Sequence, residues 1–566
     1  MADFKTDLRD LEFTLFEWLK IQDHSSDMGE NDLKDILNQY DKFIGNEIYP
    51  TREKGDVEGV KLENGQVKVP ECFHKANQQF YENGWFALGY PEEIGGMPVP
   101  HALSVACTSI ANGANVSWTM YYGLSRAAMN VIYTVGTEEQ KNKYIPKMME
   151  GSWGGTMCLT EAGAGSDVGA AKSTAEPVGD GTYKIKGVKI FISSGDNDLY
   201  ENIVHLVLAR TPGSPEGTKG LSLFIVPKNK INADGSTGEF NNVRCTKIEE
   251  KMGLHGQATC ELTFGQEGEC LGEMIGNEHE GIVNMFIMMN EARLLCGMQG
   301  ESQANLAYMM TEQYARERVQ FGMEINKLHD VKRMMLKMRS MTRALRALNL
   351  YAADLFDKAH DDQDVEDMIA FLTPICKSIG SEAGFQICID AIQVHGGYGY
   401  CSEYGIEQFA RDTKIATIYE GTNAIQALDF STRKVLKDGG KTLMKFATLI
   451  GEAAAKGSAD WKDECALIQE SLKGLQEIMT EFGKQASSKK MDSILFNSSD
   501  FLTYCGNLVL SWLLLEGALL AKGQNDAYYQ SKIVDFRTFC QHYLTANKGL
   551  HKTLIGFTED LSTIEL

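Results

Sequence analysis

One carboxylate, Glu420, lies among small and backbone-accessible residues in the stretch Ile418-Tyr419-Glu420-Gly421-Thr422-Asn423-Ala424-Ile425-Gln426-Ala427-Leu428. A helix-like pattern of apolar residues follows it. This setting suits a carboxylate that acts as a general base. A structural role is the alternative, because a Glu near the start of a helix is favoured by the helix dipole.

A second chemical motif lies roughly 250 residues upstream, in Met157-Cys158-Leu159-Thr160-Glu161-Ala162-Gly163-Ala164-Gly165-Ser166-Asp167-Val168-Gly169-Ala170. Its glycines, mixed with Ser, Thr and Asp, predict a loop whose backbone N–H groups can approach a flat ring or a phosphate. Strand-like patterns follow it, so the loop differs from a dinucleotide-binding βαβ fingerprint. A plain Gly-rich turn is the alternative.

The elements that must position these motifs follow from changes in hydrophobic period. Helical spacing runs from Leu8 to about Met149, where Pro146 would fit only a first helical turn. Alternation typical of strands follows, and helical spacing then returns to the end of the chain. We predict an α+β multidomain fold with an N-terminal helical domain, a central β-barrel-like domain, a helical bundle domain and an additional C-terminal helical domain. The predicted boundaries are 1–156, 157–281, 282–435 and 436–566.

Composition restricts the function classes. The 566 residues include 55 Lys plus Arg and 77 Asp plus Glu, and the net charge of −22 argues against binding to nucleic acid or to anionic membranes. The 13 cysteines include no C-x-x-C pair and no spacing suited to zinc, so we expect a reducing compartment and no metal site.

The N-terminus lacks an apolar signal-peptide core, which favours a cytoplasmic location. The apolar window 501–520 is interrupted by polar residues and predicts a buried helix without stable membrane insertion.

With both motifs in view, the sequence resembles the acyl-CoA dehydrogenase family. Thr160 to Asp167 is similar to the family's T-E-P-G-A-G-S-D stretch, and Ile418 to Thr422 matches its I-Y-E-G-T stretch. The resemblance covers roughly residues 1–435 and has the same order of helical, β and helical domains. It implies an FAD-dependent enzyme of fatty acid β-oxidation.

The resemblance also implies which residues bind FAD. The Gly-rich loop would face the flavin through Met157, Leu159, Thr160, Gly165 and Ser166, and the strand at Phe191, Ile192 and Ser193 would pack against the ring. The adenosine and pyrophosphate end would contact Arg318, Gln320 and Phe321 of a partner subunit, together with Gln393, Gly396 and Gly397. Thr422 and Asn423 would close the site near the cofactor.

For catalysis, the resemblance implies that Glu420 takes the α-proton of an acyl-CoA thioester while FAD takes the β-hydride. The backbone N–H of Glu420 would help to stabilise the charge on the thioester oxygen. Substrate contacts are expected from Ser166, Asn290, Arg293 and Gly421. Some family members carry the base immediately before the arginine, but that position is Ala292 here, and Glu291 lies about 100° further around the helix.

The leading hypothesis is therefore an acyl-CoA dehydrogenase that forms trans-2-enoyl-CoA and reduces an electron-transferring flavoprotein. An acyl-CoA oxidase that reduces oxygen is one alternative, and a DNA-binding flavoprotein relative is another. The latter predicts a basic C-terminal tail, whereas this tail is nearly neutral. The extension resembles that of a long bacterial subgroup, in which it covers the surface used by shorter members to form tetramers, so a homodimer is expected. The sequence does not identify the acyl group.

Overall fold

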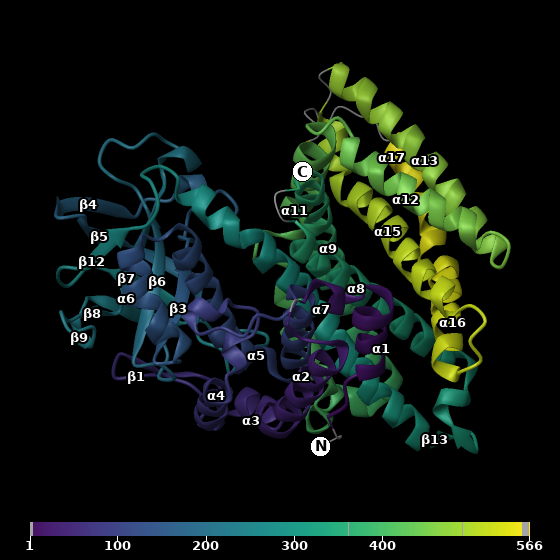
Figure 1. The fold of residues 1–566 in the computed structure, drawn as a ribbon, viewed down its shortest axis with the longest axis horizontal. Helices are drawn as coiled ribbons and strands as arrows, with labels where there is room; N and C mark the ends of the chain where they lie inside the picture. Colours follow the sequence, from purple (N-terminus) through teal and green to yellow (C-terminus); the bar gives the residue numbers. More distant parts are fainter. Residues whose placement is uncertain (1–3, 26, 360–361, 489–490, 557–564, 566) are drawn as a thin grey trace. The chain divides into compact units, whose positions relative to one another are not determined.

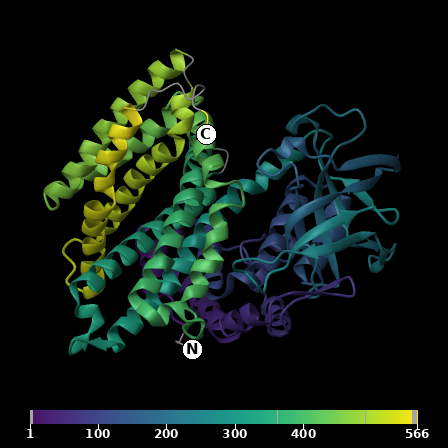
Figure 2. The ribbon, with the colours of Figure 1, turned by 180° about the vertical axis from the view of Figure 1, so that it is seen from behind.

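The computed structural model describes all residues except 1–3, 26, 360–361, 489–490, 557–564 and 566, and it leaves out the side chains of 286–290. The chain divides into two compact units (Figures 1 and 2). Unit 1 comprises Met1–Asn38, Pro100–Gly113 and Arg293–Leu566. Unit 2 comprises Gln39–Val99 and Ala114–Ala292. The chain crosses between them within α2 (Glu30–Phe43), α5 (His101–Val135) and α7 (Gly281–Glu317).

Unit 2 is built around an eight-stranded sheet in the order β10-β11-β5-β12-β7-β6-β3, with β4 paired to β5. Every residue of β6 and β7 is buried, whereas β10 alternates between buried and exposed positions at its start. The strands are β3 (Trp153–Cys158), β4 (Thr174–Gly179), β5 (Thr182–Ser193), β6 (Asn202–Ala209), β7 (Ser222–Pro227), β10 (Val243–Ile248), β11 (Thr259–Phe264) and β12 (Leu271–Met274). A two-stranded sheet of β8 (Asn229–Ile231) and β9 (Thr237–Phe240) is separate from it.

The N-terminal part of unit 2 contains a hairpin that the helical prediction for this region missed. Strands β1 (Lys61–Glu63) and β2 (Gln66–Lys68) pair across Asn64 and Gly65, whose φ angles are 52° and 76°. Positive φ at both turn residues is typical of the two-residue hairpin turn that Asn-Gly favours. The Asn-Gly pair was therefore the available sequence signal.

The helices of unit 2 include α3 (Thr51–Glu58), α4 (Cys72–Glu82) and α6 (Glu138–Met149). Helix α6 begins with a capping box, in which Thr137 Oγ1 accepts from the Gln140 N–H and Gln140 Oε1 accepts from the Thr137 N–H. The expectation that Pro146 would lie in a first helical turn is wrong, because it lies near the end of α6. At this position proline cannot donate the helical hydrogen bond to the carbonyl oxygen of residue 142, and the helix ends three residues later.

Unit 1 is a bundle of long helices in which α8 packs against α9, α15 and α16, as Figures 1 and 2 show. A short hairpin of β13 (Val319–Gln320) and β14 (Met323–Glu324) follows α7. The other helices are α1 (Leu8–Glu12), α8 (His329–Lys358), α9 (Gln363–His395), α10 (Ile406–Thr413), α11 (Asn423–Asp429), α12 (Lys441–Gly457), α13 (Lys462–Ser487), α14 (Asp492–Phe496), α15 (Ser498–Ala521), α16 (Ala527–His542) and α17 (Asn547–Gly556). Together with the sheet of unit 2, they confirm the predicted fold class.

Glycines allow the backbones of α7 and α9 to lie against each other. A Cβ on Gly297 would lie 2.1 Å from the Cys376 carbonyl oxygen, and one on Gly300 would lie 2.2 Å from the Gly380 oxygen. From the other side, a Cβ on Gly384 would lie 2.4 Å from the Gly300 oxygen. Because no side chain fits at these positions, the backbones of α7 and α9 are in direct contact. Both helices pack against the segment that carries Glu420.

The apolar window of the C-terminal extension lies in α15. This helix is long and apolar enough to cross a membrane, yet 83% of its most apolar window is buried inside the protein. The prediction of a buried core helix is confirmed. Its apolar character is explained by packing against α8, α12 and α16.

A buried charge cluster joins the N-terminal segment to the C-terminal extension. Asp10 is fully buried and pairs with Arg346 at 2.8 Å, with Lys532 at 2.9 Å and with Arg343 at 3.3 Å, and the Tyr528 hydroxyl donates to it at 2.8 Å. Burial opposes its ionisation, but the three cations hold the pKa of Asp10 below its ordinary value.

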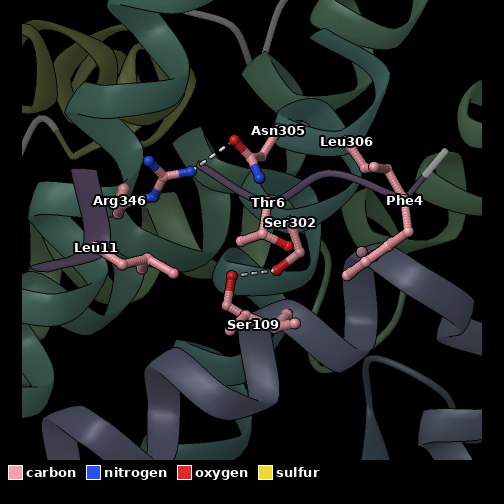
Figure 3. A pocket seen from close by; sticks show the side chains of 10 residues that line it. Phe4, Thr6, Leu11, Ser109, Ser302, Asn305, Leu306 and Arg346 are labelled. Carbon is pink, nitrogen blue, oxygen red and sulfur yellow. Dashed lines mark hydrogen bonds between the residues drawn. The ribbon is translucent and has the colours of Figure 1, made fainter. Parts of the chain in front are cut away.

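Beside this cluster lies a small pocket of mixed polar and apolar lining, in which Arg346 donates to Asn305 at 2.6 Å and Ser109 bonds to Ser302 at 2.9 Å (Figure 3). The pocket and the charge cluster together link α1, α5, α7, α8 and α16 within unit 1.

Candidate active site

The turn that carries Glu420 lies between a 3-10 helix at Lys414–Thr417 and α11, in unit 1. Glu420 has a φ of 57° and Gly421 a φ of 79°. A left-handed conformation costs a non-glycine residue about 1–3 kcal/mol and is retained most often at functional sites. The strain therefore marks Glu420 independently of the sequence motif.

The side chain of Gln426 holds this strained turn. Its Nε2 donates to the carbonyl oxygens of Glu420 at 3.1 Å and Gly421 at 3.4 Å. The Thr422 hydroxyl caps α11 by accepting from the Ile425 N–H at 3.2 Å. A Cβ on Gly421 would lie 2.8 Å from Gln426 Nε2, so the turn requires glycine for both its φ and its space.

The surroundings of Glu420 suit a proton acceptor. Burial raises the pKa of its carboxyl group, and Arg293 and Lys377 act in the opposite direction. The Glu420 N–H donates no hydrogen bond to any of the described residues. That N–H is therefore open to a ligand oxygen, as the predicted role in stabilising the thioester oxygen requires.

Arg293 lies beside the same carboxylate, in the first half of α7. It is 5% exposed, and its guanidinium lies 3.7 Å from Asp429, which also pairs with Arg433 at 2.6 Å. Burial lowers the pKa of Arg293, while Asp429 and Glu420 raise it. The structure thus brings Arg293 close to the charge of Glu420, and its substrate contact stays a prediction.

The rival base position carries no suitable group. Ala292 has no carboxylate, and Glu291 accepts a hydrogen bond from Asn130 Nδ2 at 3.0 Å within unit 2. This hydrogen bond gives Glu291 a structural partner within unit 2. The Asn290 side chain, predicted to contact substrate, lies outside the described residues.

The Gly-rich loop of unit 2 starts at the end of β3 and is anchored by a buried ion pair. Lys189 is fully buried and donates to Glu161 Oε1 at 2.9 Å and to the Leu159 carbonyl at 3.0 Å. The Ile190 N–H donates to the Thr160 carbonyl at 2.9 Å. Burial alone would raise the pKa of the Glu161 carboxyl group. Lys189 and the hydrogen bonds to Glu161 outweigh this effect and lower the pKa to about 2. The loop is therefore fixed at its base.

The open side of this loop can accept a flat ligand. Thr156 and Cys158 point into the core, while Met157, Leu159 and Thr160 retain exposure. A Cβ on Gly163 or Gly165 would meet no heavy atom within 4 Å, so neither glycine is required by protein packing. Ser166 is exposed beside them. The exposed residues of this loop therefore fit the flavin that the resemblance implies.

The strand after the loop presents an aromatic ring to solvent. Residues Ile190 and Phe191 of β5 form a β-bulge opposite Glu261 of β11. Phe191 has a φ of 57° and is 60% exposed, whereas Ile192 is 2% exposed. A bulge can redirect a side chain in this way. Phe191 is therefore placed to pack against a ring, while Ile192 could contact one only through its backbone.

The residues predicted for the adenosine and pyrophosphate end lie on two exposed turns of unit 1. Phe321 is 87% exposed with a φ of 53°, at the tip of the β13–β14 hairpin beside Gln320. Gly396, with a φ of 63°, and Gly397 follow Gln393 at the end of α9. The Arg318 guanidinium lies 5.3 Å from the ring centre of Tyr398 and so links the two turns.

Three side chains that support the site were missed by the sequence interpretation: Lys377, Lys189 and Gln426. All three are fully buried polar residues. For Lys377 the signal was a lysine within the apolar run of α9, because a buried charge requires a partner. The described residues contain no group of three or more His, Cys, Asp or Glu arranged to hold a metal ion.

Comparison with known protein families gives four matches along the chain. Residues 30–152 match the N-terminal domain of acyl-CoA dehydrogenase, residues 156–266 its middle domain and residues 279–434 its C-terminal domain. Residues 440–565 match a domain described as acetyl-CoA dehydrogenase C-terminal like. The matches cover both chemical motifs and the extension.

Two curated relatives span the whole chain. A 3-methylmercaptopropionyl-CoA dehydrogenase of Ruegeria pomeroyi is 36% identical over 100% of both chains. A broad-specificity linear acyl-CoA dehydrogenase, FadE5 of Mycobacterium tuberculosis, is 36% identical over 100% of this chain and 99% of its own length. The first agrees with the resemblance to a long bacterial subgroup.

Among solved structures, an acyl-CoA dehydrogenase from Bacillus anthracis complexed with FAD has the same fold. It matches with a TM-score of 0.77 at 22% identity and covers 96% of this chain and 91% of its own.

Proposed function

Because this chain belongs to the acyl-CoA dehydrogenase family, we propose that it oxidises the Cα–Cβ bond of an acyl-CoA thioester to a trans-2-enoyl-CoA and passes the electrons to an electron-transferring flavoprotein. The protein is an oxidoreductase with FAD as its cofactor. Two full-length relatives are dehydrogenases by name, which supports this choice over an oxidase. The acyl group, the electron acceptor and a role in fatty acid β-oxidation are parts of the proposal.

The observation that carries the proposal is the Glu420 turn. A partly buried carboxylate with a raised pKa occupies a strained backbone position, next to an arginine and with its own N–H open. A free carboxylate is too weak a base for a thioester α-proton, so the charge that develops on the thioester oxygen must be stabilised. One turn can supply both the base and a hydrogen-bond donor.

The proposed reaction assigns the following roles to residues of this chain. As the Cα–H bond breaks, a carboxylate oxygen of Glu420 forms a new O–H bond with the α-proton. The Glu420 N–H stabilises the negative charge on the thioester oxygen, and Gln426 keeps that N–H in place through the two carbonyls it binds. FAD, when bound, accepts the hydride from Cβ.

The test is Glu420→Gln with a panel of acyl-CoAs, following the absorbance of the oxidised flavin. We expect the variant to retain FAD and to bind ligand, while the rate of flavin reduction falls by about 10²–10⁴-fold or more, because the general base is lost. Glu291→Gln serves as the matched control and should be reduced at the wild-type rate. Rapid bleaching of Glu420→Gln by substrate would refute the assignment.

The electron acceptor needs a separate measurement. The reduced enzyme should transfer electrons to an artificial one-electron acceptor and form little peroxide in air. Oxygen turnover without transfer to such an acceptor would identify an oxidase instead.

We further propose a cytoplasmic homodimer. The support is the exposed apolar surface on the β13–β14 hairpin and the turn after α9, where Phe321 and Tyr400 are each 87% exposed. Val319 and Met323 on the same hairpin are also exposed, and a contiguous exposed apolar surface is typical of a contact with another protein or a ligand.

A further inference from the structure

A lysine that the proposed reaction does not use lies beneath the Glu420 turn. Lys377 of α9 is fully buried. Its Nζ donates to Asn423 Oδ1 at 2.9 Å, and Asn423 is the first residue of α11, three positions after Glu420. A buried ammonium group costs several kcal/mol unless an anion or several acceptors compensate it. The position of Lys377 therefore calls for an explanation.

Asn423 connects one face of α9 to the catalytic turn. Its Oδ1 also accepts from Ser381 Oγ at 3.2 Å. Its Nδ2 donates to the Ser378 carbonyl and to Glu382 Oε2, each at 3.4 Å. Residues 377, 378, 381 and 382 share one face of α9. The start of α11, and with it the turn that ends at Thr422, is thus fixed to that face.

The charges around Lys377 explain why it remains buried. Burial lowers its pKa, Cys296, Glu420 and Glu382 raise it, and Arg293 lowers it further. Burial raises the pKa of the Cys296 thiol to about 12, so this group is neutral. Among the described residues, Lys377 forms no ion pair with a carboxylate within 4.0 Å. Of the carboxylates that raise the pKa of Lys377, Glu420 has the largest effect.

The other cation near Glu420, Arg293, shares Asp429 as a counter-ion with Arg433. Arg293 lies 3.7 Å from Asp429, so part of its charge is already balanced. The titratable and charged groups that face Glu420 are therefore Arg293 and Cys296 of α7, Lys377 of α9 and the neighbouring Tyr419. Lys377 is the cation in this group whose charge is least compensated.

We propose that Lys377 is a positioning residue that fixes the Glu420 turn through Asn423 and keeps the Glu420 carboxylate ionised until it takes the α-proton. The inference rests on the proposed function, since it assigns Lys377 a role toward the base of that reaction. It explains both the buried ammonium and the use of an asparagine at the start of α11.

The first test is Lys377→Met, which keeps most of the side-chain volume and removes the charge. The rate of flavin reduction by an acyl-CoA that bleaches the wild type is measured against pH. We expect the midpoint of its rise to move up by about one pH unit or more, because an opposite charge has been removed from near the carboxylate. Lys377→Arg should restore most of the wild-type midpoint. Lys532→Met, which removes a buried lysine beside Asp10, should leave the midpoint unchanged.

Two variants of Asn423 separate the charge from the hydrogen bond. Asn423→Ala removes the link but keeps the ammonium group, so the maximal rate should fall with a smaller change of midpoint. Asn423→Asp places a carboxylate against Lys377 and should shift the midpoint upward, as Lys377→Met does. Because the new carboxylate also repels Glu420 directly, Lys377→Gln, which removes the charge but keeps a donor for Asn423, provides the test if Lys377→Met does not fold.

A second readout does not depend on turnover. The infrared band of the protonated Glu420 carboxyl group, identified by its loss in Glu420→Gln, is followed against pH. It should persist to higher pH in Lys377→Met and in Asn423→Asp than in the wild type. Unchanged midpoints in both readouts would overturn the role of Lys377. If no acyl-CoA bleaches the wild type, the proposed function fails, while the infrared titration still decides whether Lys377 controls Glu420.

Discussion

At the scale of the residue, the main finding is that predicted functional positions coincide with backbone strain. Glu420, Phe191 and Phe321 are all non-glycine residues with positive φ. For Phe191 and Phe321 the conformation is combined with high exposure, which is rare for a bulky side chain. These three positions, predicted from a family resemblance, are among ten non-glycine residues with positive φ in the described part of the chain. Their individual contacts with FAD and substrate stay predictions.

The raised pKa of Glu420 predicts the pH dependence of the reaction. The base must be ionised, so the rate of flavin reduction should rise with pH through a midpoint above the ordinary glutamate pKa of about 4.3. Rapid mixing with substrate over a series of buffers measures this rate. A rate that is already maximal at the ordinary carboxyl pKa would contradict the environment described for Glu420.

The Gly421→Ala variant tests the geometry of the turn. The new Cβ would lie 2.8 Å from Gln426 Nε2, and the alanine would have to adopt a φ of 79°. We expect a fall of about tenfold or more in kcat, because the Glu420 N–H and carboxylate would be displaced. The ratio of flavin to protein should not change. Gly439→Ala, which has a φ of 67° and no atom within 4 Å of its Cβ, controls for backbone strain alone.

At the scale of the element, packing explains how α7 and α9 serve the site. The glycines at 297, 300, 380 and 384 bring the two helices into backbone contact, and this contact places Arg293, Cys296 and Lys377 beneath one turn. The long π-helical segment Phe430–Leu436 continues α11 and follows directly on Asp429, the partner of Arg293. Such irregular helices occur often near functional sites.

The charge cluster around Asp10 makes the N-terminal segment a support for the C-terminal extension. Asp10→Ala should leave Arg343, Arg346 and Lys532 with one buried anion fewer and destabilise unit 1 by about 3–5 kcal/mol. Hydrogen exchange should show faster exchange in α16, and thermal unfolding should begin at a lower temperature. Glu30→Ala, which removes an exposed pair with Lys34, should change stability by no more than about 0.5 kcal/mol. Equal effects of the two substitutions would contradict a supporting role for the cluster.

At the scale of the whole molecule, the exposed hairpin tests the proposed homodimer. Phe321→Asp should weaken the dimer and lower the ratio of FAD to protein, because a charge would replace an aromatic ring at a surface predicted to bind both a second subunit and the cofactor. Light scattering and flavin absorbance measure the two effects. Val57→Asp, at a position that is also 87% exposed, is the control and should change neither. A wild-type monomer with full FAD content would contradict the proposal.

The order of helical and β regions and the Gly-rich loop were predictable from the sequence, because they depend on local period and on residue type, whereas Glu420 as the base was predicted from the family resemblance. The sequence also indicated that α15 is a core helix, since polar residues interrupt its apolar run. It missed the β1–β2 hairpin and misplaced Pro146, because short elements and helix ends depend on a few residues whose local preference is weak.

Tertiary packing shows which buried polar side chains hold the Glu420 turn and the Gly-rich loop. Gln426 is near Glu420 in sequence, but Lys377 lies 43 residues before it on another helix, and Lys189 reaches the loop from the next long strand. Each of these partners is fixed by distance and burial, which depend on how whole helices and strands pack. A linear pattern records the type of a residue, whereas the free energy of a buried charge depends on what surrounds it in space.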